Sequence, residues 1–277
     1  MKVQFENKIM SSLLLFIDHH LLSKGEAFTN HAGLFYPVTN LYNNYYTYAA
    51  PFKQMVNDDG VSNATVMKTV YVDGVEKNIG QGGLHGINHF QGQVHFTSNQ
   101  GNSVISGNYA VKDFNIYLTN DPEQKLLFET KHQTNPKYPQ QLSGLAPDAQ
   151  PYPAIFIKNM GGGNSPAALG GLQDTLTTAR LVVLADSNYK LDAVCSILKD
   201  LGGRRVHLKV HTDLPFDAMG SYTGVNYNYG NLTSEADNPL IQDVRVSRMS
   251  MVGDFNRLNP DVFSAFVDID ISTFRTP

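Results

Sequence analysis

The spacing of apolar residues along the chain changes from helical steps to strand-like alternation and back. Residues 7–24 carry apolar side chains at steps of three and four, which predicts a helix with one buried face. The residues of this face are Ile9, Leu13, Phe16, Ile17 and Leu21. Gly25 follows, and we expect it to end the helix in the left-handed conformation.

Between residues 66 and 132 the apolar residues alternate with polar ones. This period predicts strands with one buried face, and Asp73-Gly74 is a preferred dipeptide for a hairpin turn. In residues 113–118, Phe114, Ile116 and Leu118 share one such face. We expect an antiparallel sheet or small sandwich here. The preceding residues 31–54 are rich in aromatic residues and Asn, so we expect an irregular, packed connector.

Prolines mark the boundary between the two halves of the chain. Residues 135–153 contain Pro136, Pro139, Pro147, Pro151 and Pro153. Proline fixes φ and cannot donate a ladder hydrogen bond, so this segment predicts a linker or a belt over the surface. The predicted units are therefore residues 1–135, a linker at 136–153, and a C-terminal unit at 154–277.

The C-terminal unit alternates apolar strands with one strong helix. Strands are expected at 154–159, 177–186, 204–212, 243–254 and 265–274, with a Gly-, Asn- and Tyr-rich loop at 215–240. The helix covers 187–203, with Ser187 or Asn188 as its cap and Gly202 at its end. The predicted fold class is α+β: an N-terminal helix and antiparallel β region, then one sheet with one main packing helix.

Composition and charge narrow the class of protein. The chain has 277 residues, 42% hydrophobic and 17% charged, which is typical of an ordinary globular protein. Its net charge is −4, and no basic cluster is available to hold a nucleic-acid backbone. The single cysteine, Cys195, excludes an internal disulfide framework. The apolar run in 11–22 stops at Asp18, so we expect neither an export signal nor a membrane anchor.

The closest approach to an enzyme motif is the glycine-rich segment after residue 159. Gly161 and Gly163, with Asp186 further on, imitate a dinucleotide-binding unit. However, Pro166 occupies the third glycine position, and the segment that should be a helix is rich in Gly and Thr. We therefore interpret residues 161–171 as a mobile surface loop.

The remaining candidate residues favour structural roles. His85, His89 and His95 lack helical spacing for a metal, and Lys209 stands between His207 and His211 on a face that we expect to be solvated. His19 and His20 suit a helix C-terminus. Asp268 and Asp270 are expected on the solvent-exposed face of a strand, and residues 57–60 are expected to form a turn. Cys195 is expected to pack as a small hydrophobic residue. Tyr42, Tyr45, Tyr46 and Tyr48 are expected to pack over a core. The sequence thus predicts no catalytic, cofactor-binding or metal-binding residue.

The succession of strands and turns in the β region resembles that of a known class of proteins. The segments "FQGQVHF" (90–96) and "VISGNYAVKDFNIYLTND" (104–121) are similar to strand–turn–strand segments of tailed-bacteriophage virion proteins. Residues 50–54, 126–132 and 152–159 strengthen this likeness. Residues 176–274, a sheet with one helix and a C-terminal strand pair, resemble tail-terminator and neck proteins, that is, head–tail completion proteins.

This resemblance implies a structural role without catalysis. Such proteins form rings between head and tail, so we expect a ring of six subunits that contacts other neck and tail proteins in the virion. Loops 161–171 and 221–232 would be contact arms, and a mildly acidic bore would let DNA slide past without specific binding. Two alternatives stay open. One is a carbohydrate- or protein-binding β module that uses Tyr42–Tyr48, and the other is a nucleotide-binding enzyme that uses Gly161, Gly163 and Asp186.

Overall fold

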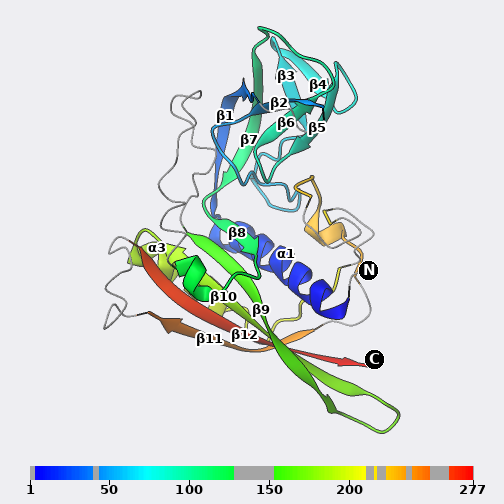
Figure 1. Ribbon diagram of the computed structural model, residues 1–277, viewed down its shortest axis with the longest axis vertical. Coiled ribbons are helices and arrows are strands. Elements are labelled where there is room, and N and C mark those ends of the chain that lie inside the picture. Colours follow the sequence, from blue (N-terminus) through cyan, green and yellow to red (C-terminus); the bar gives the residue numbers. More distant parts are fainter. Residues whose placement is uncertain are drawn as a thin grey trace.

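The computed structural model describes residues 4–39, 44–127, 153–209, 215–216, 223–234, 239–249 and 262–276. These residues form two sheets, with a long helix between the two sheets (Figure 1). The fold is α+β and dominated by its sheets, which confirms the predicted fold class.

The first sheet has seven strands in the order β4-β3-β7-β1-β2-β6-β5 and curls until it is nearly closed (Figure 1). Its strands are β1 (Phe28–Pro37), β2 (Tyr46–Ala49), β3 (Thr69–Val72), β4 (Val75–Asn78), β5 (Leu84–Asn88), β6 (Gln93–Phe96) and β7 (Ile105–Lys112). The β3–β4 turn is the predicted one, with positive φ at Asp73 and Gly74. Neighbouring strands are antiparallel, and their inner side chains form a core of their own around Phe96 and Tyr109.

The second sheet has five strands in the order β11-β12-β10-β9-β8. These are β8 (Asn115–Leu118), β9 (Ala154–Pro166), β10 (Gln173–Ala185), β11 (Leu240–Arg248) and β12 (Phe263–Arg275). β10 pairs antiparallel with β12 over its whole length and with β9 on its other side. β8 lies at one edge, parallel to β9.

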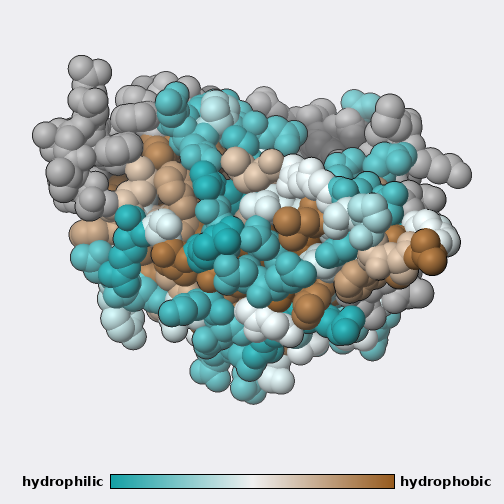
Figure 2. Space-filling model, turned by 90° about the horizontal axis from the view of Figure 1, so that it is seen from below, coloured by the Kyte–Doolittle hydropathy of each residue, from teal (hydrophilic) through white to brown (hydrophobic). Residues whose placement is uncertain are grey.

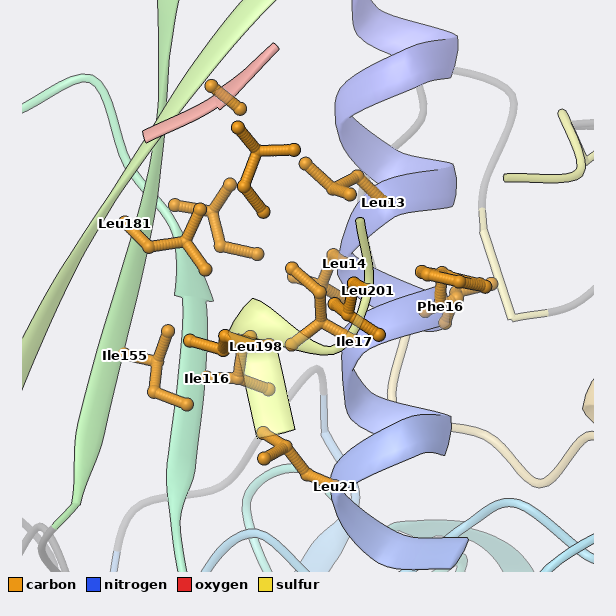
Figure 3. Packing of buried hydrophobic residues seen from close by; sticks show 14 of the residues in the cluster. Leu13, Leu14, Phe16, Ile17, Leu21, Ile116, Ile155, Leu181, Leu198 and Leu201 are labelled. Atoms are coloured by element: carbon orange, nitrogen blue, oxygen red, sulfur yellow. The ribbon is translucent and has the colours of Figure 1, made fainter. Parts of the chain in front are cut away.

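Helices α1 (Phe5–Gly25) and α3 (Asn188–Lys199) pack against the same face of the second sheet. α3 begins as predicted, because Ser187 Oγ accepts a hydrogen bond from the backbone N–H of Lys190 at 3.3 Å. Its predicted end at Gly202 is wrong, because the last helical residue is Lys199 and the C-cap is Asp200. Aliphatic side chains of both helices and of β8, β9 and β10 meet in one core (Figure 3). The labelled members include Leu13, Ile17, Ile116, Ile155, Leu181 and Leu198. A helical turn at 123–127 contributes Leu126 to a smaller cluster on the opposite face.

α1 is buried on nearly every side, not on a single face as its spacing predicts. All residues from Ile9 to Asp18 are buried. The helix lies between the second sheet and the connections of the first, and a helix that is apolar all round is typical of such a position. Its end also differs from the prediction, because the left-handed residue is Glu26 (φ 45°) and Gly25 is the last helical residue.

Two further predictions about local structure are wrong. Residues 31–54 contain most of β1 and the whole of β2, and are not an irregular connector. The side chains of β1 are mostly exposed on both faces, so its sequence shows no alternation of apolar and polar residues. The strand forms because its backbone pairs with β7. Residues 204–209 make isolated bridges, Arg205 with Leu240 and Lys209 with Ser234, instead of a strand.

The predicted units share a core. The proline-rich linker lies outside the described residues except for Pro153, so the predicted boundary stays a prediction. However, α1 and β8, which the sequence assigns to the N-terminal unit, pack against the sheet of the C-terminal unit. The second sheet is therefore completed by residues from both halves of the chain.

Candidate functional site: the β9–β10 arm

The distal parts of β9 and β10 form a two-stranded arm that projects beyond the body of the molecule (Figure 1). We define the arm as residues 159–179. Every side chain from Met160 to Gly171 is exposed, and Leu169 at the tip is 103% exposed. No residue between Asn159 and Gln173 is charged. Seen from below, the surface mixes apolar and hydrophilic side chains (Figure 2). Such a long neutral, exposed ribbon is a candidate interaction element.

Two of its glycines have backbone roles. The register between β9 and β10 shifts opposite Thr178, where Gly161 has φ 88°, a conformation that other residues rarely adopt. A Cβ on Gly162 would lie 1.8 Å from the backbone oxygen of Leu176. The prediction of a loop at 161–171 is therefore wrong: residues 161–166 are strand and only 167–172 form the turn. The glycines allow a bulge and a close strand approach.

The N-terminus of α1 anchors the base of the arm. The Glu6 carboxylate accepts hydrogen bonds from Thr177 Oγ1 at 3.2 Å and from Asn159 Nδ2 at 3.3 Å. The Arg275 guanidinium lies 4.0 Å from the centre of the Phe5 ring. These contacts, together with the pairing of β10 to β12, hold the arm in a fixed direction relative to the body.

A cavity of about 340 Å³ opens beside the base of the arm, between α1, the end of β8 and the middle of β9. Met10, Leu118 and Ile157 supply its apolar surface, and Asn7, Asn120 and Asn159 supply amide groups. Each of the described residues that line it is uncharged. The cavity can therefore accept apolar and neutral polar groups without the cost of burying a charge.

The structure separates the residues of the nucleotide-binding alternative. Gly163 pairs with Leu176, whereas Asp186 follows the other end of β10, about 30 Å away at the rise of a strand. The glycines lead into a second strand, so they do not begin a helix that could hold a pyrophosphate. Asp186 is exposed and pairs with Lys190 at 2.8 Å. The structure therefore does not bring Gly161, Gly163 and Asp186 together as a dinucleotide-binding unit would.

The histidines lie apart and have partners inside the protein. His89 is buried, and its two ring nitrogens contact the backbone oxygens of Gly224 and Met67 at 3.0 and 2.8 Å. His95 contacts Thr47 Oγ1 at 3.0 Å, and burial lowers its pKa. His85 stacks on Tyr45 at 4.0 Å.

The prediction that residues 207–211 present a solvent-exposed face is also wrong in part. His207 is exposed, but Lys209 is buried, and its Nζ donates to the backbone oxygens of Tyr229 and Leu232. His211 lies outside the described residues. Among the residues that the structure describes, no group of three or more His, Cys, Asp or Glu side chains could hold a metal ion.

Two contacts that sequence reasoning missed join α1 to the first sheet and its connections. Lys112 on β7 forms a buried ion pair with Asp18. His19 Nδ1 lies 2.6 Å from Asp58 Oδ2, and its ring stacks on Tyr229 at 4.5 Å. The predicted turn at 57–60 thus contains a fully buried carboxylate. No local pattern marks these pairs, because their members lie far apart in sequence.

The other predicted structural residues lie largely where expected. Cys195 is buried on α3, and burial raises the pKa of its thiol to about 11. Asp268 and Asp270 lie on the outer face of β12, partly exposed, and pair with Arg180 and Arg245. They are thus members of surface ion pairs and not merely solvated.

The tyrosine-rich segments have partners within the protein. Tyr48 is buried and Tyr45 stacks on His85, whereas Tyr42 lies outside the described residues. Of the predicted contact loop at 221–232, residues 223–232 are described and pack onto the body. Tyr227 and Tyr229 are buried in the main core. This part of the loop is therefore not a free contact arm.

The class of protein that these observations define is an α+β protein with a projecting β arm whose exposed residues 160–171 carry no charge. No known protein family matches the chain, and no curated protein matches it. Among the helices of the described residues, none has the length and apolar character needed to cross a membrane.

Proposed function

We propose that this protein is a structural subunit of a tailed-bacteriophage virion and forms a ring in the neck or tail, as a tail terminator or head–tail connector. The observation that carries the proposal is the arm: twelve consecutive exposed residues, 160–171, without a charge, held on a rigid base. Natural proteins usually protect such edges with charged residues, so a neutral, exposed arm favours contact with another chain.

The surroundings of the arm support the same role. Met160, Leu176 and Phe274 are 44%, 39% and 61% exposed on the arm and its flanking strand. Apolar groups are stabilised when a partner covers them, and heterologous contacts between such surfaces generate rings. The net charge of −4 agrees with a ring through which DNA passes without being held. The proposed partners are the other copies of this chain in a ring of six, and neighbouring neck and tail proteins.

Electron microscopy and sedimentation of the purified protein test this proposal. We expect rings for the parent, alone at high concentration or with its neck partners. Replacing residues 165–174 with Asn-Gly joins Asn164 to Thr175, which are register partners, and should give a folded monomer. Val75→Asp, at an exposed position of the β3–β4 hairpin, is the matched control and should still form rings. A parent that stays monomeric even with neck partners would overturn the proposal.

A further inference from the structure

The neutral tip of the arm and the neutral cavity at its base match each other in chemistry. The tip, residues 167–172, contains only Ala, Leu and Gly, and Leu169 points into solvent without any covering atoms. The cavity combines apolar surface from Met10, Leu118 and Ile157 with a rim of amides. The outer face of the sheet, in contrast, carries charged side chains, for instance in the pairs of Arg180 with Glu123 and of Arg245 with Asp270.

The tip cannot reach the cavity of its own chain. Asn159 lies in the cavity wall, and the strand from Asn159 to Pro166 carries the tip about 23 Å away at the rise of a strand. Pairing with β10, and the pairing of β10 with β12, keeps the arm extended. Any contact between tip and cavity therefore joins two different molecules.

We propose that the arm tip of one copy, with Leu169 as its anchor, occupies the cavity between α1 and β8 of the next copy. This inference rests on the proposed ring, and it names the contact that builds it. Tip and cavity are different surfaces of the same chain, so the contact is heterologous and propagates from head to tail until a ring closes. At about 340 Å³ the cavity has the size of a small-ligand pocket, so it accepts a few side chains and not a whole folded element.

The chemistry favours this occupant over a charged partner. A Lys, Arg, Asp or Glu side chain in the cavity would lose water, and no described lining residue offers an opposite charge. Leucine, in contrast, gains from burial against Met10 and Leu118. Ala167 and Ala168 keep the backbone of the tip narrow enough to enter beside Asn7 and Asn120.

Pairwise cysteine cross-linking tests the contact directly. Leu169→Cys and Asn120→Cys are prepared as separate proteins, mixed and mildly oxidised. A disulfide requires Cα atoms within about 7 Å, so a covalent heterodimer that joins the two variants reports the tip inside the cavity. The native Cys195 is buried and stays out of the reaction. Leu169→Cys mixed with Val75→Cys, an exposed position on the far hairpin, is the control and should give no heterodimer.

A second variant pair gives an independent readout. Leu169→Asp should weaken self-association at least about tenfold in sedimentation, whereas Leu169→Met, which conserves volume, should retain it. Both variants should keep the parent fold, because Leu169 is fully exposed in the single chain.

The outcomes separate this inference from the proposed function. Cross-linked dimers together with loss of association in Leu169→Asp support the contact. Rings that form without the disulfide, and equally well with Leu169→Asp, would overturn the contact but leave the ring. Cross-linking of Leu169→Cys to a different virion protein would overturn the contact between two copies and would show that the arm tip binds that protein. Monomers throughout, even with neck partners present, would overturn both.

Discussion

The ammonium group of Lys112 on β7 donates hydrogen bonds to both carboxylate oxygens of Asp18 on α1, at 2.7 Å each. The two side chains are only 3% and 1% exposed, and their residues are 94 positions apart. The pair therefore joins the curled sheet to the helix that packs on the second sheet. In this way it helps to fix the curled sheet relative to the second sheet.

Breaking this pair on one side should be strongly destabilising. Lys112→Met leaves the Asp18 carboxylate buried without its cation, so we expect the free energy of unfolding to fall by about 3–5 kcal/mol. Adding Asp18→Leu removes the unpaired charge and should recover most of that loss. Urea unfolding of the parent, both single variants and the double variant forms a thermodynamic cycle. A loss below about 1 kcal/mol in both single variants would contradict the structural role of the pair.

Removing the buried carboxylate of Asp58 should lower the free energy of unfolding more than removing the carboxylate of Asp59. Asp58 Oδ1 accepts hydrogen bonds from the backbone N–H groups of Gly60 and Tyr229 at 2.9 Å each. Asp58→Ala leaves both backbone N–H groups without their acceptor, so we expect a loss of about 2–4 kcal/mol in the free energy of unfolding. Asp59→Ala is the matched control, since Asp59 is exposed and pairs with Lys68 at the surface. Its loss should stay below about 1 kcal/mol, and equal losses in the two variants would refute the prediction.

Cys195 should react slowly in the folded protein. Burial raises the pKa of its thiol from 9.0 to about 11, so the reactive thiolate is about a hundredfold scarcer near pH 8. We expect alkylation by iodoacetamide to be slower by at least this factor than in urea. Cys195→Ser should cost on the order of 1–3 kcal/mol and leave assembly intact. Fast alkylation under native conditions would show that the thiol is accessible.

Stability should decrease as the pH falls below about 6.5, partly through His20. Burial, and to a smaller degree the charge of Arg204, lowers the pKa of His20, while its Nδ1 contacts the backbone oxygen of Phe16. In the unfolded chain His20 has an ordinary histidine pKa of about 6.5. As the pH falls, the unfolded chain therefore binds a proton at this residue more readily than the folded chain does. Acidification from pH 8 to pH 5 therefore favours unfolding.

Replacing this histidine gives the sign test. The destabilisation caused by His20→Gln should be largest at pH 8 and shrink towards pH 5, because only the parent has a titrating group at this position. Thermal unfolding of both proteins across this range measures the difference. A destabilisation that grows towards pH 5 would mean that the folded state favours the protonated ring.

Local sequence was sufficient where neighbouring residues determine the structure. The helix at 188–199 follows from an apolar stripe and a serine cap, and the β3–β4 hairpin follows from Asp73-Gly74, which accommodates positive φ at both positions. The long strands β10 and β12 follow from alternating or continuous apolar residues. In each case the information lies within about a dozen consecutive residues.

Tertiary structure decided what depends on distant backbone. Gly162 reads as part of a loop or a nucleotide motif, but its lack of a side chain is required by the approach of Leu176 from the opposite strand. β1 has no clear alternation because its pairing with β7 is made by backbone groups, which every residue carries.

The candidate site shows the same division. That residues 160–173 of the arm are uncharged and rich in glycine is evident from the sequence alone. Its strand pairing, its anchor at Glu6 and the cavity beside it arise only when α1, β8 and β9 meet. The pairs of Asp18 with Lys112 and of His19 with Asp58 likewise join residues 94 and 39 positions apart. A periodic pattern records which side of an element is buried, but only the folded chain determines which charged group lies opposite another.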